Sequence, residues 1–415
     1  MALDDDRTVS ARTTVAYLQS PEAIRDRTRA LFALAQQDQL QHFRYHPEAL
    51  PAAANYVLRV MQQQYPSGSV PFHSRWRHFE VSGQSRLEAL SQLSLLSPLE
   101  QARLKVDLAI TSVLLDAGTG GQWQYTEPAT GLVFQRSEGL AIASLHSFAA
   151  GLFSSQPDIP WQADASGLRQ LTVDQLAQAF QVSDDNPLLG LEGRVTLLQK
   201  LGHTLLQKPQ LFGTVPRPGG LVDYWQQQAR DGQLSAVVIL QTILAGLGPI
   251  WPGRVEVAGT NLGDVWPHPQ LPDNGLGSNL VPFHKLSQWL TYSLLEPLQD
   301  LGLTITDLDQ LTGLAEYRNG GLFVDCGVLS LKDPAAAERA HAPGSPLIVE
   351  WRALTLCLLD DLAAHLRQAL DLDATALPLV KILQGGTWTA GRKIAAEKRP
   401  SGRPPVRLDS DGTVF

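Results

Sequence analysis

The sequence predicts a mainly α-helical protein that folds as one α-rich domain with a few short strands and long loops. Two helix-start patterns, SPE at 20–22 and SPLE at 97–100, place Ser at the N-cap and Pro at the first helical position. Apolar residues at helical spacing follow both patterns. Neither a fixed-period repeat nor a clear linker divides the chain, so we expect a flexible lead over residues 1–20 and a single domain over 21–415.

The expected elements follow one another closely. The helix that starts at 21 precedes one through 56–61, and the Glu of SPLE completes a capping box for a third that ends near 116. Further helices are expected from 138, from 172, over 187–205, 235–248, from 285, over 307–314, over 348–370 and after the glycines at 385–386. The turn-rich residues 122–135 indicate a hairpin. The residues after 314 are expected to form an extended segment broken by glycines, and residues 334–346 are expected to form a loop.

Composition and charge exclude several classes of protein. Of 415 residues, 44% are hydrophobic and 18% charged, which is enough for a core, and the net charge of −8 argues against a general nucleic-acid or anionic-membrane binder. Two cysteines, Cys326 and Cys357, form no disulfide framework or Cys-rich zinc site. The N-terminus shows no signal peptide, and the most apolar stretch, 236–251, is too short and broken for a membrane span. We expect a cytoplasmic protein without nucleic-acid or membrane partners.

Ionisable and aromatic residues are densest between 281 and 328. On the helix predicted there, one stripe is formed by Lys285, Trp289, Tyr292 and Glu296, and leucines occupy a different face of the helix. The stripe either lines a cavity or forms a buried aromatic face with polar ends that reach solvent.

Two carboxylates in this region are candidates for catalysis. Glu316 precedes Arg318, Asn319 and a glycine pair, and Asp325 follows shortly after. Carboxylates beside an open backbone suit hydrolysis at an anomeric carbon, where one of them orients water and stabilises an oxocarbenium-like transition state. The alternative is that Glu316 forms a structural ion pair with Arg318 or a nearby cation.

A candidate anion site lies near the C-terminus. The glycines at 385–386 precede a predicted helix start, where backbone N–H groups can approach a phosphate. Lys381, Arg392 and Lys393 would add positive charge. The alternative is a plain turn between helices with arginines at its surface.

The sequence gives little support for a metal site. The common phosphate-loop, dinucleotide, zinc-protease and serine-hydrolase motifs are absent. Asp264, His268 and His284 could be gathered around an ion, but they have no strong ligand spacing. We expect neither a metal nor another cofactor.

From about residue 130 to its last residue, the sequence contains the long motifs SEGLAIASLHSF, NPLLGLEGRVTLLQKLG, VPFHKLSQWLTYSLLEPL, LTGLAEYRNGGLFVDCGVL, VEWRALTLCLLD, GGTWTAGRKIAAEKRP and SDGTVF. These motifs resemble the uracil-catabolism family of fungi and bacteria, long described as a domain of unknown function and the fourth-named component of a uracil-degradation pathway. More remotely, LTGLAEYRNGGLFVDCGVL resembles queuosine-nucleotide N-glycosylases, which implies a helical, DNA-glycosylase-like fold. Glu316 stands where that family has Asp, and the following Asn-Gly-Gly departs from its Val-Pro-Gln, although the Tyr-Arg pair is kept.

The resemblance implies a pathway in which uracil is ribosylated, its ring is opened, and a ribosylurea-type intermediate leads to urea. That pathway needs a step that cleaves the ribose–urea N-glycosidic bond. We therefore predict an N-ribosyl hydrolase (an N-glycosidase) whose substrate is ribosylurea or its 5′-phosphate.

This prediction assigns roles to the candidate residues. His284 or Lys285 would protonate the leaving group, and Glu316 or Asp325 would orient water, with Asp264 as a third acid whose pKa burial could raise. Three aromatic residues would wall the pocket: Trp289, Tyr292 and Trp388. Asn319 and Lys285 would contact the substrate. A phosphate would be held by Arg318, Lys381 and Arg392. The alternatives are a metal-dependent amidohydrolase acting on a ring-opened ureido pyrimidine, and a non-catalytic sensor or partner.

Overall fold

The computed structural model describes residues 11–83, 85–87, 90, 95–116, 118–119, 121–399 and 401–409. The terminal SDGTVF motif and residues 1–10 of the expected lead lie outside these ranges. By its internal contacts the chain divides into two compact units, which are described separately below. Unit 1 comprises the residues up to His73, Gly253–Trp289 and Asp307–Phe415, and unit 2 comprises Ser74–Pro252 and Leu290–Thr306.

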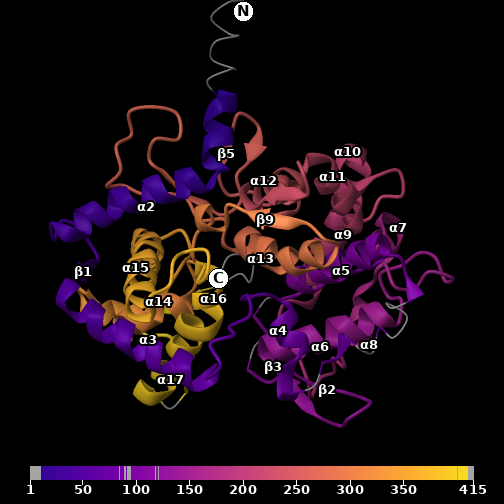
Figure 1. The fold of residues 1–415 in the computed structure, drawn as a ribbon, viewed down its shortest axis with the longest axis horizontal. Helices are drawn as coiled ribbons and strands as arrows, with labels where there is room; N and C mark the ends of the chain where they lie inside the picture. The colour runs from indigo at the N-terminus through magenta and orange to yellow at the C-terminus, as the bar shows by residue number, and fades with distance from the viewer. Residues whose placement is uncertain are drawn as a thin grey trace, which may run out of the picture. The chain divides into compact units, whose positions relative to one another are not determined.

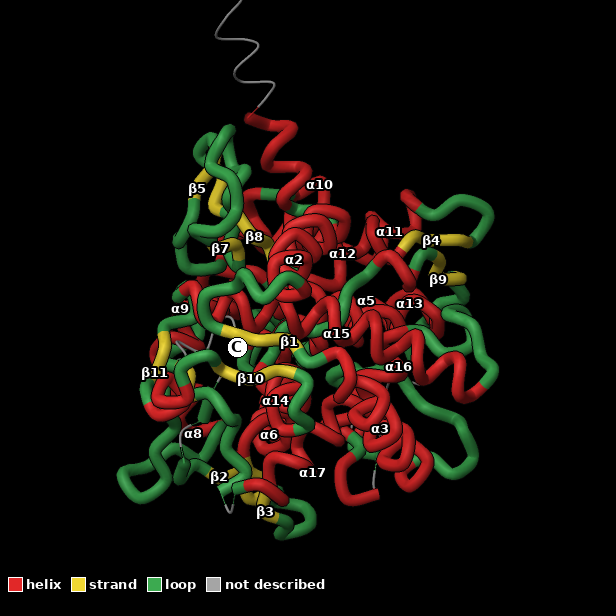
Figure 2. The backbone as a smooth tube through the Cα atoms, turned by 90° about the vertical axis from the view of Figure 1, so that its left-hand side faces the viewer, coloured by secondary structure: helices red, strands yellow, loops and turns green. Residues whose placement is uncertain are grey.

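The predicted fold class is confirmed, because helices dominate both units and every strand of the described chain has only two or three residues. The strands pair only in twos, which gives six two-stranded sheets among the described residues. Figure 2 shows these short strands as connections between helices. None of the helices that the structure describes is both long and apolar enough to cross a membrane.

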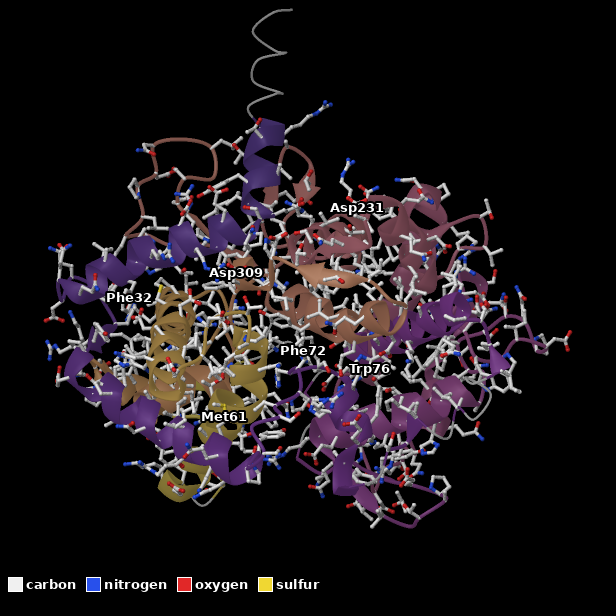
Figure 3. All side chains as sticks on the ribbon, viewed as in Figure 1. Phe32, Met61, Phe72, Trp76, Asp231 and Asp309 are labelled. Atoms are coloured by element: carbon white, nitrogen blue, oxygen red, sulfur yellow. The ribbon has the colours of Figure 1, made fainter. Side chains whose placement is uncertain are left out.

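Unit 1 is built around the 25-residue helix α15 (Pro346–Leu370), which packs against α2 (Pro21–Gln36), α3 (Leu50–Gln64) and α14 (Tyr317–Asp325) (Figure 1). Figure 3 draws the side chains of the described residues and labels Phe32 on α2 and Met61 on α3, both of which are buried. The remaining elements of unit 1 are the start of α13 (Lys285–Asp300), α16 (Leu379–Ile382), the π-helical turn η8 (Leu383–Thr387), α17 (Trp388–Lys398), β1 (Phe43–Tyr45), β5 (Glu256–Val257), β6 (Thr260–Asn261), β7 (Val265–Pro267), β8 (Leu280–Pro282), β10 (Leu329–Leu331), β11 (Ala340–His341), β12 (Arg407–Leu408), η1 (Pro47–Ala49), η6 (Leu308–Gln310) and η7 (Pro334–Glu338).

Unit 2 is a separate helical assembly, in which α5 (Pro98–Leu114) packs against α6 (Arg136–Ala149), α9 (Leu191–Gln207) and α11 (Leu221–Gln228). Asp107, in the middle of α5, is fully buried and accepts hydrogen bonds from Arg217 Nε (2.8 Å) and the backbone N–H of Gly219 (2.6 Å). The remaining elements are α4 (Trp76–Phe79), η2 (Val81–Gly83), β2 (Gln124–Thr126), β3 (Val133–Gln135), α7 (Ala165–Gln170), α8 (Val173–Ala179), α10 (Pro209–Phe212), η4 (Pro218–Gly220), β4 (Gln233–Ser235), α12 (Ala236–Leu247), η5 (Gly248–Ile250), the rest of α13, and β9 (Thr304–Thr306).

The helix starts read from local patterns are confirmed, but Glu100 does not complete the predicted capping box, because its carboxylate binds Arg103 and Arg217. Ser20 Oγ accepts the backbone N–H of Ala23 (3.1 Å), and Ser97 Oγ accepts that of Glu100 (3.3 Å). The hairpin expected at 122–135 is the antiparallel pair β2–β3. These elements were predictable because their stabilising contacts lie within a few residues along the chain.

Two expectations about 307–328 were wrong. The predicted helix over 307–314 is only the short 3₁₀ turn η6, and the predicted extended segment is instead the helix α14. The glycine pair does not break this helix, because Gly320 lies directly against Trp351 and Thr355 of α15, and Gly321 against Pro405. The glycines allow close helix packing here rather than an extended backbone.

Residues 11–18, which we expected to belong to a flexible lead, are helical. Leu18 is fully buried in a small cluster with Val257, Leu262, Val265 and Leu280. These apolar contacts fix the segment, and local sequence gives no sign of them because they come from residues more than 200 positions away.

A Gly391→Ala substitution should destabilise the protein by at least about 2 kcal/mol, because the new methyl group would collide with the backbone carbonyl oxygen of Arg318 where α17 crosses α14. Guanidinium chloride unfolding measures this difference. Gly193→Ala in α9 is the matched control: its methyl group meets open space and should stabilise the helix by up to about 1 kcal/mol. Equal effects of the two substitutions would contradict the tight α14–α17 contact.

Candidate functional site

The carboxylate of Glu316 lies at the N-terminus of α14. Glu316 takes the N-cap position, where its two oxygens accept the backbone N–H groups of Arg318 (2.7 Å) and Asn319 (2.6 Å). The residue is only 6% exposed. Burial raises the pKa of Glu316, although the two N–H groups and the charge of Lys285 act in the opposite direction. A buried carboxylate with a raised pKa is poised to accept a proton, and such groups concentrate at functional sites.

Arg318 does not form the ion pair with Glu316 that we considered as an alternative. Its guanidinium group lies over the ring of Tyr317, 5.0 Å from the ring centre, and its Nη1 donates a hydrogen bond to the carbonyl oxygen of Gly402 (2.8 Å). The cation whose charge lowers the pKa of Glu316 most is instead Lys285, at the start of α13.

A buried ion pair positions both Glu316 and Lys285. The guanidinium of Arg352 on α15 binds both oxygens of Asp264, each at 2.7 Å. Asp264 Oδ2 also accepts the backbone N–H of Lys285 (3.0 Å), and Arg352 Nε donates to the carbonyl oxygen of Ala315 (3.1 Å). The pair therefore connects the first residue of α13 to the residue that precedes Glu316.

The expectation that burial raises the pKa of Asp264 was wrong. Burial acts in that direction, but Arg352, the Lys285 N–H group and the indole N–H of Trp266 lower the pKa to about 2. Asp264 is therefore a permanently charged anchor at neutral pH.

The rings of His73 and Trp388 lie against each other, and the charge of Lys285 also acts on His73. Their ring centres are 5.8 Å apart, and the guanidinium of Arg392 lies 5.8 Å from the Trp388 ring. His73 Nδ1 donates to Gln384 Oε1 (2.9 Å), which leaves Nε2 as the acceptor nitrogen. Burial lowers the pKa of His73 to about 4, and the charge of Lys285 acts in the same direction.

Buried polar atoms without a hydrogen-bond partner gather on the elements that carry these residues. Within the part of the chain that the structure describes, they include both amide atoms of Gln288 on α13, Oδ1 of Asn319 on α14 and Oγ1 of Thr387 in η8. All three residues are fully buried. Since nearly all buried polar groups in proteins are hydrogen-bonded, each of these three groups is a candidate contact for a polar ligand or ordered water. We refer to Lys285, Gln288, Glu316, Asn319 and Thr387 together as the Glu316 cluster. Lys285 is related to Glu316 by its charge and Asn319 by its backbone hydrogen bond, and Gln288 and Thr387 are included for their unpartnered polar atoms.

The structure does not bring Asp325 to this cluster. Asp325 ends α14, and its two oxygens bind the guanidinium of Arg399 at 2.7 and 2.6 Å. It lies nine positions after Glu316, about 13.5 Å along the helix axis at 1.5 Å per residue. The imidazole of His284 is also engaged, since its Nε2 donates to the carbonyl oxygen of Leu18 (2.8 Å).

The remaining predicted contacts are placed as follows. Trp289 is 7% exposed on the part of α13 that belongs to unit 1, whereas Tyr292 is 1% exposed and belongs to unit 2. Glu296, also in unit 2, accepts hydrogen bonds from Ser74 and Arg77, both at 2.6 Å. Lys381, on α16, is partly exposed.

The predicted phosphate loop at 385–386 was wrong. Residues 379–398 form one continuous helical stretch whose middle is the π-helical turn η8, so its backbone N–H groups are used within the helix. Gly385 lies against Val70 and Met61, and Gly386 against Val57, where a side chain would not fit. These glycines allow η8 to pack closely on α3. A π-helical turn of this kind is often found at functional sites, and it carries Thr387 of the Glu316 cluster.

The three residues considered for a metal site each have another partner. Asp264 binds Arg352, His284 donates to the carbonyl oxygen of Leu18, and His268 Nδ1 accepts the backbone N–H of Gln270 (3.3 Å). His268 Nε2 lies 3.7 Å from Glu350 Oε1, which is beyond hydrogen-bond distance. No group of three or more His, Cys, Asp or Glu side chains among the described residues is arranged to hold a metal ion. Glu350 accepts three backbone N–H groups from residues 41–43.

Comparison with known proteins places the chain in a family. Residues 17–415 match the model of the family described as "Protein of unknown function (DUF1688)". The chain belongs to this family. Among curated proteins, it is 40% identical over 418 residues to "Protein urg3" of Schizosaccharomyces pombe, and 39% identical over 437 residues to "Uracil catabolism protein 4" of Lachancea kluyveri. Each alignment covers 97% of this chain and 99% of the relative. The resemblance to the uracil-catabolism family is thereby confirmed.

Two residues of the Glu316 cluster were not predicted from the sequence of this DUF1688 protein. Gln288 and Thr387 lie inside motifs that carried the resemblance, but their buried, unpaired amide and hydroxyl groups were unforeseen. A polar residue one helical turn after Lys285, in a leucine-rich helix, was the available signal for Gln288. For Thr387 the sequence gave only its place beside a glycine pair.

A His73→Gln substitution should change how stability depends on pH. The pKa of His73 is about 4 in the folded protein and about 6.5 in an unfolded chain, so the unfolded state binds more protons between these values. The stability that neutral His73 contributes is complete above pH 6.5 and is lost as the pH falls toward 4. The wild type should lose up to about 3 kcal/mol relative to His73→Gln between pH 7 and 4.

Guanidinium chloride unfolding at a series of pH values measures this difference. His203→Gln, at an exposed position on α9, is the control and should follow the wild-type pH profile. A His73→Gln profile parallel to that of the wild type would contradict the burial of a neutral imidazole.

Proposed function

We propose that this protein acts in uracil catabolism, and that it is an N-ribosyl hydrolase that cleaves the ribose–urea bond of ribosylurea or its 5′-phosphate. The printed name of the Lachancea kluyveri relative supports the pathway. The observation that supports the reaction best is the buried Glu316 carboxylate, with its raised pKa, beside the charge of Lys285.

In the proposed reaction, Glu316 accepts a proton from water as the water oxygen bonds to the anomeric carbon. The carboxylate also stabilises the positive charge that develops on the sugar before the new bond is complete. Two backbone N–H groups hold the carboxylate still, so little reorganisation is needed when the sugar cation forms.

The bond from the anomeric carbon to nitrogen breaks with its electron pair left on urea. Because the urea anion is a poor leaving group, a proton must reach that nitrogen, and Lys285 is the proposed donor. The products are urea and the free sugar, and the proton held by Glu316 can return to Lys285 through solvent. His284 is a poorer candidate for this donor because its Nε2–H is already bound to a carbonyl oxygen.

The polar atoms of Gln288, Asn319 and Thr387 would bind the ureido group and the sugar hydroxyls. Both are rich in donors and acceptors, which matches buried amide and hydroxyl groups that lack protein partners. Trp388 would form an aromatic wall, and Arg392, which lies near its ring, would hold a 5′-phosphate when the substrate carries one. Lys381 and Arg318 are further candidates for that phosphate.

The two alternatives predict different chemistry. A metal-dependent amidohydrolase would use Asp264, His268 and His284, but the carboxylate of Asp264 is already bound by Arg352 and the imidazole of His284 by the carbonyl oxygen of Leu18. A non-catalytic sensor would use the Glu316 cluster to bind a pathway intermediate without turnover.

Urea release from ribosylurea and its 5′-phosphate by the purified protein tests the proposal directly. Urea production that persists after the protein is treated with a chelator would support the hydrolase. Activity only on a ring-opened precursor, and only after metal is restored, would support the amidohydrolase. Saturable binding without any product would favour the sensor.

A further inference from the structure

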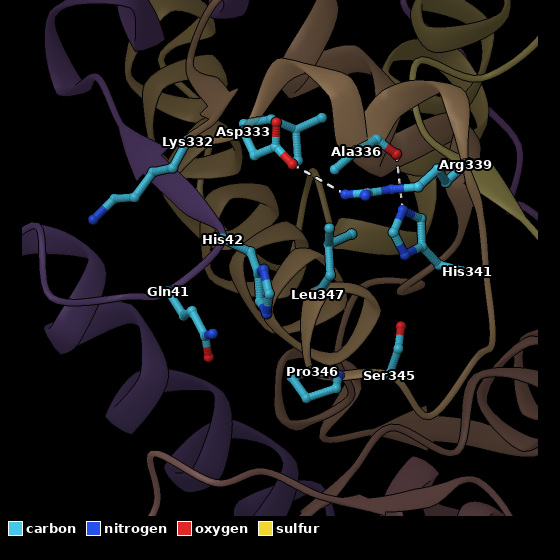
Figure 4. Close-up of a pocket in the computed structure, with 11 residues that line it drawn as sticks. Gln41, His42, Lys332, Asp333, Ala336, Arg339, His341, Ser345, Pro346 and Leu347 are labelled. Atoms are coloured by element: carbon cyan, nitrogen blue, oxygen red, sulfur yellow. Dashed lines mark hydrogen bonds and ion pairs between the residues drawn. The ribbon is translucent and has the colours of Figure 1, made fainter.

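Unit 1 contains a second candidate site, a pocket that includes no residue of the Glu316 cluster. It has a volume of about 380 Å³, within the range of small-molecule sites. It lies between the segment before β1, the end of β10, η7, β11 and the start of α15 (Figure 4). Its lining residues are Gln41, His42, Leu331, Lys332, Asp333, Ala336, Arg339, His341, Ser345, Pro346 and Leu347.

Backbone hydrogen bonds fix the wall that carries His42. Glu350, fully buried on α15, accepts the backbone N–H groups of Gln41 (3.1 Å), His42 (2.9 Å) and Phe43 (3.2 Å). The carbonyl oxygen of His42 accepts the N–H of Lys332 (2.8 Å) beside the β1–β10 pair. His42 and Lys332 are therefore held side by side before any ligand enters.

The opposite wall is fixed in the same way. His341 Nε2 donates to the carbonyl oxygen of Ala336 (2.8 Å), so Nδ1 is the nitrogen left for a ligand. Arg339 Nη2 donates to Asp333 Oδ2 (3.0 Å) at the rim. His42 and His341 both line the pocket. Burial lowers the pKa of His42, and the charge of His341 acts in the same direction.

The pocket is lined by Lys332, Arg339, Asp333 and the two imidazoles of His42 and His341. Lys332 Nζ lies 2.8 Å from Asp38 Oδ1, and Arg339 is bound to Asp333. The lining groups that can donate to an anion are therefore the exposed guanidinium of Arg339 and the two imidazoles.

The start of α15 adds hydrogen-bond donors. Ser345 is the N-cap residue of this helix but makes no capping bond, and its buried Oγ has no hydrogen-bond partner among the described residues. The N-terminus of a 25-residue helix, where backbone N–H groups and the helix dipole favour negative charge, thus opens into a pocket that already holds an arginine and two imidazoles.

We propose that this pocket binds a small phosphate monoester, with the phosphate held by His42, Arg339, His341 and the start of α15. Donors on several sides of the pocket match the three terminal oxygens of a phosphate better than the two of a carboxylate. The carbon part of the ester would lie on Leu331, Ala336, Pro346 and Leu347. This proposal does not depend on the hydrolase activity.

Isothermal titration calorimetry of the full chain with glycerol 3-phosphate tests the proposal. Glycerol and inorganic phosphate are the comparison probes, and they separate the contributions of the carbon part and the phosphate. Arg339→Gln should weaken binding by about tenfold or more, because a charge-assisted hydrogen bond is lost. The Arg339 side chain is 65% exposed, so this variant should fold normally. His341→Asn, whose amide can still donate to Ala336, should weaken binding by a similar factor.

Two controls locate the binding. Arg59→Gln removes an exposed arginine outside the pocket and should leave the dissociation constant unchanged. Glu316→Gln should also leave it unchanged if the ligand occupies this pocket and not the Glu316 cluster. Equal affinity for the ester and inorganic phosphate would identify free phosphate as sufficient and would still support a phosphate site. No saturable binding, equal affinity for glycerol, or full affinity in both Arg339→Gln and His341→Asn would overturn the proposal.

Discussion

Glu316→Gln should reduce the rate of urea release from ribosylurea by about 10²- to 10⁴-fold, the range typical for loss of a general base. The substituted amide cannot accept the proton from water, and it carries no negative charge to stabilise the sugar cation. The fold should persist, because the amide oxygen can still accept one of the two N–H groups at the start of α14, at a cost of about 1 kcal/mol.

Asp325→Asn provides a matched control at the other end of the same helix. Asp325 is bound by Arg399, so the substitution should lower stability while leaving urea release within a few-fold of wild type. Substrate binding to the inactive Glu316→Gln variant, measured by calorimetry, separates a chemical defect from a binding defect. The assignment of Glu316 as the base would be contradicted if Glu316→Gln released urea at the wild-type rate, or if only Asp325→Asn lost urea release.

Asp264→Ala should lower the free energy of unfolding by about 3–5 kcal/mol, because it leaves the fully buried guanidinium of Arg352 without its carboxylate. The substitution also removes the acceptor for the backbone N–H of Lys285 and the indole N–H of Trp266. Denaturant unfolding monitored by circular dichroism measures the loss.

The double variant Asp264→Leu/Arg352→Met separates stability from positioning. Replacing both charges with apolar side chains of similar size should recover most of the stability. It should not recover urea release, because nothing would then connect the start of α13 to Ala315. A double variant with wild-type turnover would show that the ion pair serves stability alone.

The helix starts illustrate what could be predicted from the sequence. Ser20 and Ser97 cap their helices by contacts within three residues, so the local pattern contained the whole interaction. Helix α14 was missed because its glycines suit a break when considered alone. Their actual role, contact with Trp351, Thr355 and Pro405, depends on residues far along the chain.

The candidate site was predicted only in part, for the same reason. The density of charged and aromatic residues drew attention to Lys285 and Glu316, and the structure relates the two electrostatically. The sequence could not distinguish Glu316 from Asp325, because only folding shows that a helix separates them and that Arg399 binds the second. Nor could it show that Arg352 lowers the pKa of Asp264.

The sequence by itself determined the helical class, the capped helix starts and membership of the DUF1688 family, because these depend on short patterns or on similarity along the whole chain. Only the tertiary structure decided which carboxylate is buried under the influence of a lysine charge, which glycines allow close packing, and which side chains line a pocket. Burial and electrostatic coupling arise between residues distant in the chain, and they set the pKa values on which the proposed chemistry depends.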